Sequence, residues 1–245
     1  MFQRKTIQMI TEEVAIIPEG SMLDSNLYVI GTAGNLMLID SGNGMATNNI
    51  LNLIKNQFGT DRIQAILQTH YHIDHILGLY QFKKKFPDIK VYAHELEAKV
   101  IETGDNKYIN PMANMFMGPL QSLVEPVAKL FGINPEPTKV DIKLKEGDMV
   151  NWGNLALKVI HTPGHTPGGI CLHDKQKKIL FTGDTVFSHG SFGRVDFIGG
   201  SAELLQKSLK KLAELEDVEI LLPGHMNPVL QNGKKHLELA SSMWF

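Results

Sequence analysis

Apolar positions along the chain fall into short runs in two separate stretches, and longer amphipathic segments lie between and after these runs. Short apolar runs bounded by polar or glycine-rich turns predict buried β-strands, whereas apolar residues three or four positions apart predict helices. The predicted strands are residues 6–10, 14–17, 27–31, 36–39, 63–67 and 90–93 in the first stretch, and 141–144, 155–160, 170–173, 178–181 and 218–222 in the second. The predicted helices are residues 46–58, 76–86, 94–101, 202–215 and 234–243. This order predicts an α/β fold of two related halves, each a sheet covered by helices.

Length and composition are those of a single globular unit. The chain of 245 residues can bury a sizeable core, and no linker or low-complexity segment divides it, so we expect residues 1–245 to form one domain. A formal net charge of −2 gives no sign of electrostatic binding to nucleic acid. No signal-peptide core or membrane-length apolar stretch is present, and the single cysteine, Cys171, excludes an internal disulfide. We therefore expect a cytoplasmic protein that binds a small molecule and neither nucleic acid nor membrane.

Four potential metal ligands lie within six residues, at His70, His72, Asp74 and His75. A predicted strand precedes them and a predicted helix follows them, so the cluster would occupy a strand-to-helix turn. Three imidazoles and one carboxylate suit a borderline divalent ion such as zinc, manganese or iron. Strand alternation directs His70 and His72 to the same side, which suggests one metal on this pair and a second on Asp74 and His75.

Three further candidate ligands, His165, Asp184 and His225, lie in similar local settings. Each follows a predicted apolar strand and has a glycine directly before it, where the backbone can bend sharply near an ion. His165 also lies between two Pro-Gly pairs, which predict a rigid loop. The recurrence of one arrangement three times favours a shared metal centre.

In this order the candidate ligands resemble those of the metallo-β-lactamase-fold superfamily, and the resemblance spans about residues 14–225. It implies a four-layer αββα sandwich whose ligands gather where the two halves meet. Carried over position by position, it implies one metal on His70, His72 and His165, a second on Asp74, His75 and His225, and Asp184 as the bridge between them.

Asp40, in Leu38-Ile39-Asp40-Ser41-Gly42, matches an aspartate that the family keeps near its site. One interpretation is that Asp40 orients a ligand imidazole through the nitrogen that does not bind metal. The alternative is that Asp40 only shapes the turn before the glycines.

The ligand set predicts metal-assisted hydrolysis of a thioester, ester or lactone. Two ions sharing Asp184 would lower the pKa of a bound water, and Asp74 could orient the nucleophile and help to protonate the leaving group. Within the superfamily the sequence looks most like the glyoxalase II-like hydrolases, with two zinc ions as the expected cofactor and iron or manganese as alternatives. Only 20 residues follow His225 (245 − 225), which leaves no room for the helical domain that carries that family's glutathione contacts.

Two other reaction classes stay open. The stretch 193–197 and the short spacings between the last three candidate ligands resemble persulfide dioxygenases, which would use one iron on His70, His165 and Asp184. A dimetal centre also suits a phosphodiesterase, although the nearly neutral charge disfavours a nucleic-acid polymer as its substrate.

Residues 103–138 are an insert in the predicted pattern. Met112, Met115, Phe116 and Met117 precede apolar positions spaced three or four apart over residues 120–131, which predicts one or two amphipathic helices. These helices could add packing, form the contact of a homodimer, or cover the metals as a lid with an adaptable methionine surface.

Overall fold

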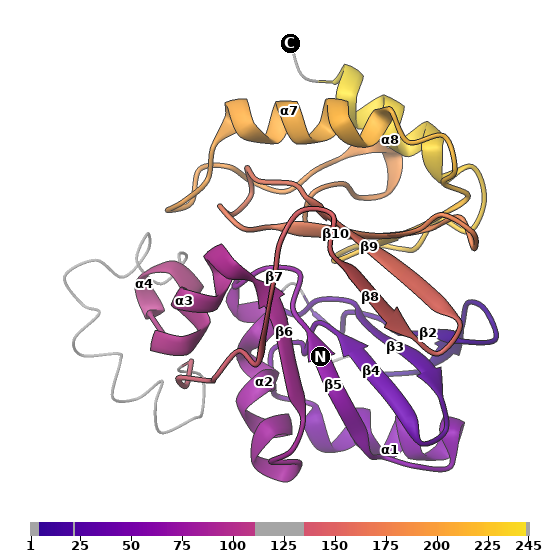
Figure 1. Ribbon diagram of the computed structural model, residues 1–245, viewed down its shortest axis with the longest axis vertical. Helices are drawn as coiled ribbons and strands as arrows, with labels where there is room; N and C mark the ends of the chain where they lie inside the picture. The colour runs from indigo at the N-terminus through magenta and orange to yellow at the C-terminus, as the bar shows by residue number, and fades with distance from the viewer. Residues whose placement is uncertain (1–4, 22, 111–134, 244–245) are drawn as a thin grey trace.

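Two β-sheets stack face to face in the computed structural model, which describes residues 5–21, 23–110 and 135–243 (Figure 1). The first sheet runs in sequence order through β1 (Gln8–Met9), β2 (Val14–Ile17), β3 (Leu27–Thr32), β4 (Asn35–Ile39), β5 (Ile63–Leu67), β6 (Lys90–His94) and β7 (Ile142–Leu144). The second has the order β12 (Ile220–Pro223), β11 (Ile179–Gly183), β10 (Ile170–Asp174), β9 (Leu155–His161) and β8 (Met149–Trp152).

Each sheet changes from antiparallel to parallel pairing along its width. Strands β1 to β4 pair antiparallel, and β4 to β7 pair parallel. Strands β8 to β11 pair antiparallel, whereas β11 and β12 are parallel. Because parallel neighbours end at the same edge of a sheet, the loops after β4 and β5 lie together, as do the loops after β11 and β12.

Helices cover the outer face of each sheet. Against the first sheet lie α1 (Thr47–Phe58), α2 (Ile73–Lys85) and α3 (Glu95–Thr103), and the short α4 (Asn106–Ile109) follows α3. Against the second lie α7 (Ala202–Ala213) and α8 (Gly233–Ser242), with the 3₁₀ turn η2 (Ser188–Gly190) beside α8 (Figure 1). These layers confirm the predicted αββα sandwich. None of the helices in the described residues combines the length and apolar character that a membrane crossing requires.

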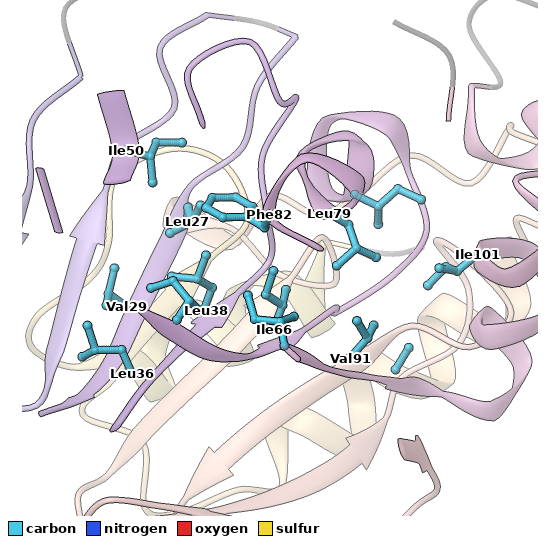
Figure 2. Packing of buried hydrophobic residues seen from close by; sticks show 14 of the residues in the cluster. Leu27, Val29, Leu36, Leu38, Ile50, Ile66, Leu79, Phe82, Val91 and Ile101 are labelled. Carbon is cyan, nitrogen blue, oxygen red and sulfur yellow. The ribbon is translucent and has the colours of Figure 1, made fainter. Parts of the chain in front are cut away.

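Both faces of most strands are buried, which explains why these strands read as continuous apolar runs. Alternate residues of one strand enter different cores: Ile16 packs between the two sheets, and Ile17 packs beneath the helices of the first sheet. Figure 2 shows the helix-facing core, where Phe82 of α2 meets Leu38 of β4. Phe181 of β11 anchors the core between the sheets and is completely buried.

Three details differ from the sequence-based predictions or lie beyond them. Helix α2 begins at Ile73, so Asp74 and His75 belong to its first turn and not to a preceding turn. Strand β8 was not predicted, because Val150 is its only buried residue. Residues 111–134, which hold most of the predicted helical insert, lie outside the described residues, so its role as lid or interface stays a prediction, as does the single-domain organisation.

Candidate metal centre

The candidate ligands come together from both sheets at the ends of four strand-to-loop connections. His70 follows β5, His72 is the N-cap of α2, and Asp74 and His75 lie in the first turn of that helix. The other three lie in the β9–β10 loop (His165), directly after β11 (Asp184) and after β12 (His225).

The first cluster consists of His70, His72 and His165. One nitrogen from each side chain lies within 4.8 Å of the others, and all three residues are buried. His72 turns its Nδ1 to within 2.8 Å of His165 Nε2. This is the grouping that the family resemblance implied for one metal.

The second cluster consists of Asp74, His75 and His225, whose ligand atoms also lie within 4.8 Å of one another. His225 Nε2 is 3.1 Å from an oxygen of Asp74 and 3.4 Å from His75 Nε2. The sequence motif alone suggested Asp74 and His75 for a second metal, and the structure brings His225 to the same place.

Asp184 lies between the two clusters. Its Oδ1 is 3.3 Å from His75 Nε2, and its Oδ2 is 3.4 Å from both His165 Nε2 and His225 Nε2. Through these two oxygens Asp184 approaches imidazoles of both clusters. It has the position that a bridging carboxylate requires.

These distances fit divalent metal ions. Two ligands of a tetrahedral zinc ion, each ~2.0–2.1 Å from the metal, lie about 3.3 Å apart. The nitrogen-to-Asp184 separations match that spacing, whereas the His72–His165 separation of 2.8 Å would have to widen by about half an ångström. His70 Nε2 and Asp184 Oδ1 are buried without a hydrogen-bond partner in the described part of the chain, as expected for atoms that bind an ion.

The two clusters differ in their charge. Burial holds the pKa values of His70 and His72 well below the ordinary range, so these imidazoles are neutral and able to bind metal. Burial would also lower the pKa of His75, but the carboxylates of Asp184 and Asp40 outweigh it and raise that pKa to about 10. The second cluster thus concentrates enough negative charge to hold protons, and a divalent cation could replace them.

Three acceptors bind Nδ1 of candidate ligand imidazoles and so fix the orientation of the rings. His75 Nδ1 donates to Asp40 at 2.8 Å, as the first interpretation of Asp40 predicted, and Asp40 also accepts from the Thr69 backbone N–H at 2.8 Å. His225 Nδ1 donates to Glu19 at 2.8 Å, and His165 Nδ1 donates to the carbonyl of Arg194 at 2.7 Å. Each contact leaves Nε2 of that imidazole for the centre.

Gly224 is required by close packing beside the ligands. A Cβ atom at this position would lie 2.3 Å from Asp184 Oδ1 and 2.7 Å from His75 Cε1. No side chain fits there, which explains the glycine directly before His225 more specifically than a need for backbone bending.

A pocket with a volume of about 290 Å³ opens beside the two clusters. Asp74, Asp184 and several of the imidazoles form its polar end, while its apolar lining includes Leu23, Ile73, Phe187, Phe192 and Phe197. Arg194 borders the pocket, but its guanidinium makes two hydrogen bonds with Asp196 and packs on the Phe197 ring at 4.4 Å. These contacts brace the loop 193–197.

The sequence pattern gave no sign of the acidic residue Glu19 or of two buried histidines away from the centre. Glu19 lies in the loop between β2 and β3 and gives no periodic signal, and its partner His225 is 206 residues away. His94 and His173 are both buried: His94 stacks on His161 at 4.2 Å, and His173 donates to the Asp217 carbonyl.

Comparison with known proteins gives the family of the chain. The sequence model of the metallo-beta-lactamase superfamily matches residues 21–225, a span that contains every candidate ligand. The acyl-coenzyme A thioesterase MBLAC2 of Bos taurus is 30% identical over 221 residues, covering 83% of this chain and 73% of that protein. The structure of the B3 metallo-beta-lactamase BLEG-1 is similar with a TM-score of 0.66 and 27% identity, over 88% of this chain and 92% of that one. TTHA1623 in a di-iron-bound form has a TM-score of 0.64 and 28% identity, over 86% and 91% of the two chains.

Proposed function

The chain belongs to the metallo-β-lactamase superfamily, and we propose that it hydrolyses acyl thioesters with two divalent metal ions. The observation that carries the proposal is the apolar pocket beside the ligand clusters. Its phenylalanine and leucine walls suit a hydrocarbon chain, and the ligands at its polar end suit the reacting carbonyl. The similarity to an acyl-coenzyme A thioesterase supports this substrate class.

The ligands divide between two ions as the clusters do. His70, His72 and His165 would hold one ion, and Asp74, His75 and His225 the other, with Asp184 between them. When bound, such a pair supplies hydroxide near neutral pH and polarises the thioester carbonyl. Zinc suits the mixed imidazole and carboxylate ligands, and iron or manganese would also fit them.

Asp74 is the residue that we assign to proton transfer. It belongs to the second cluster and also borders the pocket, and its side chain is 20% exposed. Its carboxylate would orient the attacking water and take one of its protons. As the new carbon–oxygen bond forms and the carbon–sulfur bond breaks, this proton would pass to the leaving sulfur, giving a carboxylic acid and a free thiol.

The pocket walls would position the acyl chain and keep bulk water from it. Phe187 and Phe197 flank the centre through edge-on contacts with His225 and His72, at ring separations of 5.7 and 5.6 Å. An acyl chain lying against these rings would carry its carbonyl to the ligands. The partner would then be a small molecule, in agreement with the expectation from the nearly neutral charge.

The test combines metal analysis with a series of substrates. Protein purified without added metal should hold two divalent ions per chain and release thiol from acyl-coenzyme A substrates, with a rate that depends on acyl length. Asp184→Ala should lose this activity, whereas the exposed Glu12→Gln should retain it. An acyl-homoserine lactone and a phosphodiester serve as competing substrates, and oxygen uptake is measured with glutathione persulfide. Oxygen consumption by a protein with one iron, or loaded protein without thioester hydrolysis, would refute the proposal.

A further inference from the structure

Glu97 is a buried acid to which the chemistry above gives no role. It is the third residue of α3 and is completely buried. Burial raises the pKa of Glu97 to about 8, against the effect of its hydrogen bonds from the backbone of Gly168 and Tyr71. A carboxyl group in the interior is costly unless its oxygens are satisfied, so the partners of this one indicate why it is there.

The two oxygens of Glu97 bind two separate loops. Oε2 accepts a hydrogen bond from the Tyr71 backbone N–H at 2.8 Å, and Oε1 accepts one from the Gly168 backbone N–H at 2.6 Å. Tyr71 lies between His70 and His72, and Gly168 lies three residues after His165. One carboxyl group therefore joins the two segments that supply the whole first cluster.

The helix itself does not explain this orientation. A glutamate at the third helical position commonly reaches back to the N-cap backbone. Here the side chain of His94, the N-cap residue, accepts from the Leu96 N–H, and both oxygens of Glu97 accept from backbone N–H groups of other segments. Its side chain is used entirely for contacts between distant segments.

Gly168 leaves the space that Glu97 occupies. A Cβ atom on Gly168 would lie 2.7 Å from Glu97 Oε1 and 2.9 Å from His94 Nδ1. The short hydrogen bond between Glu97 and the Gly168 backbone thus depends on a glycine at this position.

We propose that Glu97 is a positioning residue that sets the spacing of His70, His72 and His165. The proposal rests on the metal ligation proposed above. The backbone N–H of Ile170 also donates to the Thr69 carbonyl at 3.1 Å, two residues along each segment from the contacts of Glu97. Glu97 thus attaches the β9–β10 loop to the His70–His72 segment at a second point, so the imidazoles keep the close arrangement that one ion needs.

The test is the metal affinity of the first cluster in Glu97→Gln. Glutamine keeps the size of the side chain, but its amide nitrogen cannot accept a hydrogen bond, so it can accept only one of the two backbone N–H groups. Both oxygens of Glu97 keep acceptor capacity even when the carboxyl is protonated. We expect affinity for zinc or cobalt(II) to fall ~10–100-fold, as is typical when a support for metal ligands is lost. Competition with a chelator measures this loss, and a shifted cobalt(II) absorption spectrum reports the changed geometry.

Glu95→Gln is the matched control, because Glu95 lies in the same helical turn, has a side chain 44% exposed and pairs with Lys145. It should leave both readouts unchanged. Gly168→Ala should act in the same direction as Glu97→Gln, because the added methyl group displaces the carboxyl. It decides the question if Glu97→Gln does not fold.

A Glu97→Gln protein with a lowered Tm but wild-type metal affinity and cobalt spectrum would overturn the proposal. Failure of both variants to fold would do the same, since it would assign Glu97 to the stability of the fold alone. A wild-type protein that binds no divalent ion would instead refute the proposed function, so the two failures are distinguishable.

Discussion

Asp40 and Glu19 make the same kind of contact to the second cluster, but they differ in exposure. Both accept a hydrogen bond from a ligand imidazole at 2.8 Å, Asp40 from His75 and Glu19 from His225. The Asp40 side chain is 3% exposed and that of Glu19 is 32% exposed. We predict that Asp40→Asn weakens binding of the second metal ion more than Glu19→Gln does.

The expected magnitudes follow from the access of water. Removing a carboxylate behind a metal-binding imidazole typically reduces metal affinity ~10–100-fold, or about 1.4–2.7 kcal/mol. At Asp40 no water can replace the lost acceptor, and the hydrogen bonds from Thr69 are disturbed as well, so the loss should lie near 100-fold. At Glu19 water can substitute, so the loss should be near 10-fold or less. Asparagine also tolerates the left-handed backbone of Asp40, at φ 61°, so the variant should fold.

The assay is competition between a chromogenic chelator and protein loaded with two metal equivalents, which resolves the weaker ion. Glu12→Gln, an exposed change in the same N-terminal segment, is the control. Equal losses in Asp40→Asn and Glu19→Gln, or a greater loss in Glu19→Gln, would show that burial does not determine the strength of these supports.

Further outcomes are expected at five residues. Asp184→Ala should lower bound metal and abolish turnover, and His225→Ala should halve the metal content of loaded protein, both measured by elemental analysis. Burial raises the pKa of Cys171 to about 11, so iodoacetamide should modify this thiol only after unfolding, and Cys171→Ala should leave metal content and turnover unchanged. The carboxylates around His75 raise its pKa to about 10, so metal uptake near neutral pH should release a proton, measured as a pH change in weak buffer. For the same reason the ion on the second cluster should be lost first as the pH falls, measured as metal content against pH. Phe181→Ala should cost about 3–5 kcal/mol in urea unfolding, because its ring fills the core between the sheets.

Most of the fold could be predicted from the sequence because both faces of most strands are buried. Continuous apolar runs such as Ile63–Leu67 and Ile179–Gly183 then stand out from the polar loops around them. Strand β8 could not be found in this way, since its pairing with β9 and not its burial defines it. The start of α2 was misplaced because His72 serves both as the N-cap and as a candidate ligand, and its side chain makes no capping hydrogen bond.

The candidate ligands could be predicted because their chemistry is concentrated in short motifs, but the groups around them could not. Glu97 contacts Gly168 across 71 residues, and its sequence position suggested only an ordinary helix. One signal was available: Glu97 shares a helical face with Ile101, which is buried, so a charged residue was placed where the pattern called for an apolar one. The pocket walls could not be predicted either, since Leu23 and Phe197, 174 residues apart (197 − 23), line one pocket only in the folded chain.

The division of the ligands between the two sheets links metal supply to the survival of the folded protein. His70 and His225 are 155 residues apart in sequence (225 − 70), so the unfolded chain offers no comparable site. An ion that binds only the native arrangement stabilises it by about 2.7 kcal/mol when its free concentration is 100 times its Kd. Metal-starved protein would then unfold and be degraded sooner than loaded protein, and its abundance would follow metal availability independently of any effect on turnover.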